Sequence, residues 1–294
     1  MGYAGKRAFD SSTKDDFISR LLYVDACVTT LGGVALYVAP DKIADYAFSR
    51  PTDGVHWHLV RCIGGHLLAT AFACCALRRN PLARTIITLM RLITSVIVLM
   101  LLYHIQSQTP KLMRPEALEG LRYLSAGVFI VYLALWILNG WPVELLEGNE
   151  LLVRNRLGNL LYQLDCLASI LIGLAWLTFP SWLLHRQVLV PLDASHDLCG
   201  RIMGAFFVAS HVIAQHALHW PDGSERRVVV DSRVVCCTAI LGAQVWSQIA
   251  YERDWSGGHW VGISLFSTWT IIAMLYRIAI LFSKSGEVLR TKEN

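Results

Sequence analysis

Apolar residues gather in long blocks along the chain, and short polar segments separate the blocks. The blocks match the ~20 apolar residues that an α-helix needs to cross the hydrocarbon core of a bilayer. There are eight of them: Phe17–Ala39, His56–Leu77, Ala83–Tyr103, Leu121–Leu138, Gly158–Phe179, Leu198–Leu218, Val228–Ala250 and Trp260–Phe282. A helix satisfies its own backbone hydrogen bonds in lipid, so each block predicts a membrane-spanning helix. The pattern predicts an all-α, polytopic membrane protein.

One stretch of this pattern occurs twice. The copies at 51–64 and 191–204 both read P-x-D-x-x-H-x4-R-x2-G. A shift of 140 positions aligns Leu21–Ala69 with Leu161–Ala209 without a gap and pairs twelve identical residues. A repeat of this length predicts the architecture of the whole chain.

Each copy lies in a half that holds four predicted helices, so both halves have the same orientation in the membrane. We expect two parallel four-helix repeats related by a pseudo-two-fold axis along the membrane normal. The first repeat covers residues 1–142 and the second 158–294, with a cytosolic connector at 143–157.

Composition agrees with a membrane protein and supplies a topology. The chain is 54% apolar and 16% charged, whereas an ordinary soluble domain has about 25% charged residues. Thirteen basic residues flank the side that carries both termini, against seven on the other side. The positive-inside rule therefore predicts that both termini are cytosolic. The end of the chain, Arg290-Thr-Lys292-Glu-Asn294, is close to a K-x-K-x-x retrieval signal and favours the endoplasmic reticulum membrane.

Charged residues also occur inside the predicted spans, at corresponding places in the two halves. Asp25 and Asp165 are 140 positions apart, and Arg91 and Arg233 are 142 apart. Asp25 and Arg91 each lie well inside a span that starts on the cytosolic side. We therefore predict two intramembrane ion pairs, Asp25–Arg91 and Asp165–Arg233. Each pair either locks two helices together or belongs to a proton or ion relay, because charges in a membrane are costly and often functional.

The repeated motif predicts helix starts on the outer face. Asp53 and Asp193 are typical N-cap residues, and His56 and His196 follow in the first helical turn. These side chains either fasten the helix ends or form a lipid-headgroup or ligand site.

Arg61 and Arg201 of the motif lie about one turn further into the second and sixth spans. Each could extend to the headgroups, cap the carbonyl end of the span near Pro40 or Pro180, or bind a lipid phosphate. Both arginines, together with His56 and His196, are therefore candidate residues for binding a lipid headgroup.

The remaining chemistry argues against catalysis. The eight cysteines lie in or beside apolar blocks, where cysteine packs as a small hydrophobe, and their spacing matches no zinc motif. Histidines invite a haem or diiron interpretation, but the required histidine boxes do not occur. Walker, GxSxG, GxGxxG and HExxH motifs do not occur either. We therefore expect no metal and no cofactor, and the net charge of +4 gives no signal for nucleic acid.

The segments Arg61-Cys-Ile-Gly64 and Arg201-Ile-Met-Gly204 carry a family resemblance. The chain resembles the DoxX-like group of small four-helix membrane proteins, in which R-x-x-G follows an apolar span that ends near a proline. The resemblance implies that each half is one such four-helix unit. The group includes redox-associated and accessory membrane proteins, so no single activity follows, and an intramembrane aspartate is not part of its pattern.

Three hypotheses about function follow. The first is a non-catalytic accessory or scaffold subunit of a larger membrane assembly, with membrane lipids and other protein subunits as partners. The second is a transporter or lipid-translocating protein with a site at the repeat interface. The third is a membrane redox enzyme, which the visible absorption spectrum would reveal if it held haem.

Overall fold

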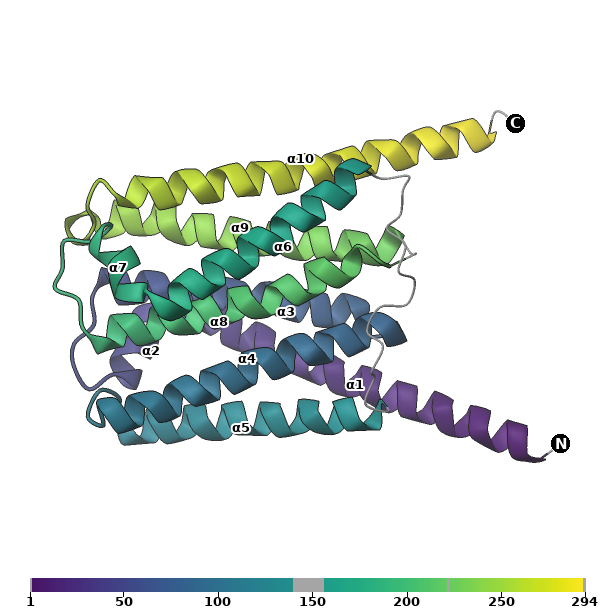
Figure 1. The fold of residues 1–294 in the computed structure, drawn as a ribbon, viewed down its shortest axis with the longest axis horizontal. Helices are drawn as coiled ribbons and strands as arrows, with labels where there is room; N and C mark the ends of the chain where they lie inside the picture. Colours follow the sequence, from purple (N-terminus) through teal and green to yellow (C-terminus); the bar gives the residue numbers. More distant parts are fainter. Residues whose placement is uncertain (1, 140–155, 221–222, 293–294) are drawn as a thin grey trace.

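The computed structural model describes residues 2–139, 156–220 and 223–292 (Figure 1). Within this part of the chain, eight helices are long and apolar enough to cross a membrane, which confirms the predicted fold class. They are α1 (Gly2–Val38), α3 (Gly54–Leu77), α4 (Pro81–Gln108), α5 (Pro115–Leu138), α6 (Arg156–Thr178), α8 (Ala194–Ala217), α9 (Gly223–Ala250) and α10 (His259–Lys292). Most of the predicted connector, residues 143–155, lies outside the described residues.

Prolines and caps set where the helices begin. Pro81 and Pro115 occupy first-turn positions, where the missing N–H is not needed, so α4 and α5 start before their apolar blocks. The prolines at 40 and 180 end α1 and α6, as predicted, but each also starts a short helix that the apolar pattern does not show. These are α2 (Pro40–Ala47) and α7 (Pro180–His185), with a 3-10 turn η1 (Glu252–Asp254) after α9.

The bundle has a layered arrangement around two central helices. Over an apolar stretch of 18 residues, 67% of α3 and of α8 is buried, compared with 44% of α4 and α9 and 17% of α5, α6 and α10. The outer helices expose large apolar side chains such as Leu31, Ile130, Leu171 and Ile271. In a membrane protein such a surface faces lipid, where apolar exposure carries no penalty.

The two halves interlock through these central helices. Within each half α3 packs on α1 and α8 on α6, but α4 packs on α8 as well as on α5, and α9 packs mainly on α3. Hydrogen bonds cross between the halves inside the membrane: Tyr37 Oη donates to the carbonyl of Ala239 at 2.9 Å, and Ser232 Oγ donates to that of Ala69 at 3.0 Å. The repeats therefore share one core and do not form two separate bundles.

Contacts within one half recur in the other at repeat-related positions. A Cβ on Gly64 would lie 2.8 Å from the carbonyl oxygen of Gly33, and one on Gly204 would lie 2.8 Å from that of Gly173. Glycine at these crossings lets the helix backbones approach closely. On the face opposite the termini, the bridge Phe48–Met113 corresponds to Val188–Trp255.

Figure 1 shows both ends of the described chain at the same end of the bundle. The repeated motif at the starts of α3 and α8 lies at the opposite end.

Candidate functional site

The site at the repeat interface starts from two identical helix caps. The Asp53 carboxylate accepts hydrogen bonds from the backbone N–H groups of Val55 (3.0 Å) and His56 (3.1 Å) in the first turn of α3. His56 Nδ1 lies 2.9 Å from Asp53 Oδ1 and 3.4 Å from the Asp53 nitrogen. This is a capping box in which histidine takes the place usually held by Glu or Gln. The predicted N-cap is present.

The second copy of the motif forms the same cap on α8. Asp193 accepts from the backbone N–H groups of Ser195 (2.9 Å) and His196 (3.5 Å). His196 Nδ1 lies 3.0 Å from Asp193 Oδ1 and 3.2 Å from the Asp193 nitrogen.

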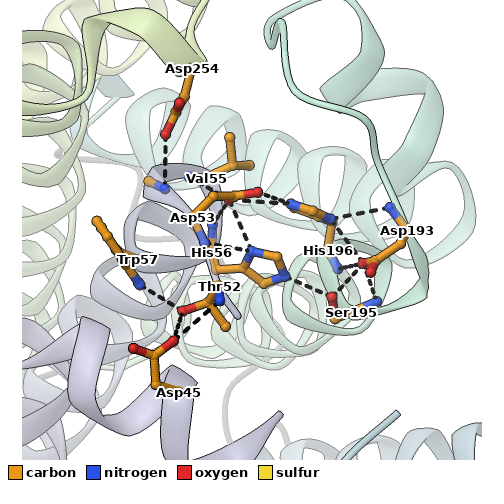
Figure 2. Close-up of polar contacts among 11 residues, drawn as sticks. Asp45, Thr52, Asp53, Val55, His56, Trp57, Asp193, Ser195, His196 and Asp254 are labelled. Atoms are coloured by element: carbon orange, nitrogen blue, oxygen red, sulfur yellow. Dashed lines mark hydrogen bonds and ion pairs between the residues drawn. The ribbon is translucent and has the colours of Figure 1, made fainter. Parts of the chain in front are cut away.

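The two boxes meet across the interface between the halves, as Figure 2 shows. The imidazole rings of His56 and His196 are in contact, with centroids 3.7 Å apart and ring planes tilted by 39°. His196 Nε2 lies 3.1 Å from Asp53 Oδ2, and His56 Nε2 lies 2.7 Å from Ser195 Oγ. Each histidine thus holds the cap of its own helix with Nδ1 and reaches the other helix with Nε2. We call Asp53, His56, Asp193, Ser195 and His196 the capping cluster.

Hydrogen bonding keeps both aspartates of the cluster ionised. Burial by itself raises the pKa of the Asp53 carboxyl, but hydrogen bonds from His196 and His56 outweigh burial and hold that pKa far below its ordinary value. Burial also opposes ionisation of Asp193, yet hydrogen bonds from Ser195 and the nearby His196 lower its pKa as well. A carboxylate can only accept, so His196 must carry its proton on Nε2 to bond Asp53.

One arrangement of protons accounts for the hydrogen bonds that join the two halves through the capping cluster. His196 Nε2–H donates to Asp53, while His196 Nδ1 accepts from the Asp193 N–H. His56 Nε2–H donates to Ser195 Oγ, and the Ser195 hydroxyl donates to Asp193.

The order Asp53–His56–Ser195 has the connectivity of a nucleophilic triad. Two observations argue against a catalytic triad at these residues. The Ser195 side chain is only 5% exposed and its hydroxyl is bonded to Asp193. Its backbone N–H, which could stabilise an oxyanion, is bonded to the same carboxylate. The geometry therefore favours a fastening role over acyl transfer.

Asp53, His56 and His196 could also hold a metal ion, since their ligand atoms all lie within 4.8 Å of one another. If His196 Nε2 were a ligand, it would lose the proton that it donates to Asp53. Metal binding through this atom would therefore replace the hydrogen bond between His196 and Asp53 that joins the halves.

The two arginines of the motif differ in their surroundings. Arg61 Nε donates to the carbonyl of Tyr37 at 3.2 Å, in the last turn of α1, and its guanidinium lies 5.8 Å from the rings of Trp246 and Tyr251. Arg61 therefore caps a carbonyl at the end of α1, which is one of the three predicted roles. Arg201 is half-buried and makes no hydrogen bond or ion pair with the residues that the structure describes.

Asp25 and Arg91 come together between three helices of the first half. Arg91 Nη2 donates to Asp25 Oδ1 at 2.6 Å and to Thr29 Oγ1 at 3.3 Å. Tyr132 Oη donates to Asp25 Oδ2 at 2.6 Å, so α5 joins α1 and α4 in this contact. Both charged side chains are largely buried, at 8% and 18% exposure for arginine and aspartate.

Asp165 and Arg233 form the corresponding contact between α6, α9 and α10. Arg233 Nε lies 2.7 Å from Asp165 Oδ1, and Arg233 Nη2 donates to Ser169 Oγ at 2.8 Å. The indole of Trp269 donates to Asp165 at 3.0 Å, in the role that Tyr132 has in the first half. An aspartate, a hydroxyl one turn later, an arginine and an aromatic donor thus recur in both halves.

Five participants in these sites were missed from the sequence: Ser195, Thr29, Ser169, Tyr132 and Trp269. Ser195 replaces the valine of the first copy, and this polar side chain in the first turn of α8 was the available signal. Tyr132 and Trp269 are aromatic residues in apolar blocks, where nothing in the spacing separates a donor to a buried carboxylate from ordinary lipid-facing or core residues.

Comparison with known protein families gives one match. The model of a family described as a domain of unknown function, DUF8292, matches residues 23–278, which is most of the chain. The comparisons with curated proteins and with solved structures return no significant match.

Proposed function

Since the chain belongs to the DUF8292 family, whose description names no activity, we propose its function from geometry alone: a non-catalytic integral membrane protein that serves as an accessory or scaffold subunit of a larger membrane assembly. Its partners are membrane lipids and other protein subunits, and not nucleic acid.

The observation that carries this proposal is that the capping cluster and the pairs Asp25–Arg91 and Asp165–Arg233 find their partners within the chain. The capping cluster bonds the two halves to each other, and Arg91 and Arg233 each face an aspartate of their own half. Buried groups that are paired in this way are held in place, because breaking one pair leaves an uncompensated charge. Such pairing supports a rigid body more than a reaction centre.

Purification from the native source in mild detergent, followed by mass spectrometry of the co-eluting proteins, tests the proposal. We expect one or more partners at a fixed stoichiometry. A lone monomer that retains its fold would contradict the subunit role.

A second candidate function is transport or lipid translocation at the repeat interface, and one observation favours it. A small void of about 20 Å³ lies between α3, α4, α8 and α9, next to His66, Ser210, Ser232 and Arg233. His66 Nε2 is buried there without a hydrogen-bond partner. The void is of the size that one water molecule needs, so a transport path would require the central helices to separate.

Vesicles containing the purified protein and a fluorescent phospholipid separate the two functions. The scaffold proposal predicts that the rate of lipid flipping equals that of protein-free vesicles. A higher rate that His66→Phe abolishes would support translocation instead.

The proposed location is the endoplasmic reticulum membrane, with both termini cytosolic. The excess of basic residues at one side of the spans and the Arg290-Thr-Lys292 tail support this proposal. Protease protection of a tag at either terminus in microsomes tests it, because a protected tag would reverse the topology.

A further inference from the structure

A cavity of about 240 Å³ lies between α6, α9 and α10 in the second half. Its floor includes the ion pair Asp165–Arg233 with Trp269 and Ala273, and the rest of the lining is mainly apolar. The lining on α6 runs from Leu161 to Ile172, which at 1.5 Å per residue is about 16 Å along the membrane-spanning helix.

The rim of this cavity faces the bilayer. Leu164, Leu265 and Ile272 line the cavity and are themselves 52%, 52% and 45% exposed. They belong to spans on the outside of the bundle, where exposed apolar side chains contact lipid. α6 packs mainly on α8, whereas α10 packs mainly on α9. The cavity therefore opens sideways, between α6 and α10, to the acyl chains around the protein.

The two halves differ at the residue that lies one helical turn after the aromatic donor to the intramembrane aspartate. Tyr132 and Trp269 have the same role, since each donates to the intramembrane aspartate of its half. The residue four positions later lies on the same helix face, one turn further along. In the first half that residue is Trp136, a buried indole, and in the second it is Ala273. The small side chain of Ala273 leaves room beside the ion pair.

We propose that this cavity is a binding site for one hydrocarbon chain of a membrane lipid. An engineered apolar cavity of about 150 Å³ already binds benzene, whereas pockets for drug-sized ligands begin at about 300 Å³. The volume and length of this cavity fit an elongated apolar chain segment and are small for a whole lipid. Its opening to the bilayer gives such a chain direct access. The inference is independent of the scaffold role, since a structural lipid fits either function.

Photo-crosslinking tests the site. The full-length protein is placed in phosphatidylcholine vesicles that contain a phosphatidylcholine with a diazirine in its acyl chain, and labelled peptides are mapped by mass spectrometry. We expect labelling of α6 and α10 at residues that line the cavity. Ala273→Trp, which copies Trp136 into the second half, should reduce this labelling at least about tenfold, corresponding to 1.4 kcal/mol or more.

Leu275→Trp is the matched control, because Leu275 lies on the same helix but is 60% exposed to lipid. It should leave the labelling of the lining unchanged. If Ala273→Trp is not monodisperse, Ala168→Phe is used in its place. This substitution narrows the cavity from the side of α6. Equal labelling in the cavity-filling variant and in the control would overturn the proposal. So would labelling of the same peptides by a photoactivatable sterol but not by the phospholipid.

Discussion

Asp25 and Asp165 occupy equivalent positions in the repeat, but they accept hydrogen bonds from chemically different side chains. A tyrosine hydroxyl bonds Asp25, and an indole bonds Asp165, while an arginine faces each of them. The pairing of aspartate with arginine could be predicted, because both residues recur at nearly the same spacing within apolar blocks. The aromatic donors could not, because they lie on another helix whose rotation the sequence does not determine.

The ion pair gives a prediction at the scale of one residue. Asp25→Asn leaves the Arg91 guanidinium without its counter-charge, and we expect the loss of about 3–5 kcal/mol of stability. Thermal unfolding in detergent measures this loss. The exchange Asp25→Arg with Arg91→Asp should recover part of it, and the absence of any recovery would count against a direct pair.

Arg61 and Arg201 give a second prediction, because the repeat makes them natural controls for each other. Arg61 bonds the end of α1, so Arg61→Gln should lower the stability by about 1 kcal/mol, the worth of one hydrogen bond. Arg201 lacks a bond to the described residues, so Arg201→Gln should leave the unfolding temperature unchanged. Equal effects of the two substitutions would contradict this difference.

At the scale of whole helices, the sequence predicts where each helix lies along the chain better than it predicts which helices pack together. The eight spans follow from the length of the apolar blocks, and the starts of α3 and α8 follow from Asp53 and Asp193. The helices α4 and α5 begin at Pro81 and Pro115, ahead of the predicted starts at Ala83 and Leu121. The short helices α2 and α7 escaped prediction because each is less than three turns long and lies outside an apolar block. The packing of α4 on α8 also escaped it, because the periodicity of one helix does not identify its partner.

Helix crossing gives a prediction at this scale. A Cβ at position 64 would collide with the Gly33 carbonyl, whereas a Cβ at Gly32 would meet nothing within 4 Å. Gly64→Ala should therefore cost about 1–3 kcal/mol, as overpacking does. The control Gly32→Ala should be neutral or slightly stabilising, because alanine is the better helix former. Unfolding curves of the two variants that coincide would show that α1 and α3 are not in close contact.

At the scale of the whole molecule, the repeat places equivalent residues next to one another at the interface. His56 and His196 are 140 positions apart, and their rings are in contact because α3 and α8 start side by side at the centre of the bundle. The sequence contained both histidines and the repeat, but the contact depends on how the halves pack. The resemblance to DoxX-like proteins and the scaffold role stay predictions at this scale.

The central claim is that the two halves form one interlocked body, joined by the capping cluster and by the crossed packing of α3 with α9 and α4 with α8. Insertion of a specific protease site between residues 142 and 158, followed by cleavage of the purified protein in mild detergent, tests it most directly. We predict that both fragments elute together in a single size-exclusion peak at the position of the uncut protein. Two separate peaks, one for each four-helix half, would contradict the account.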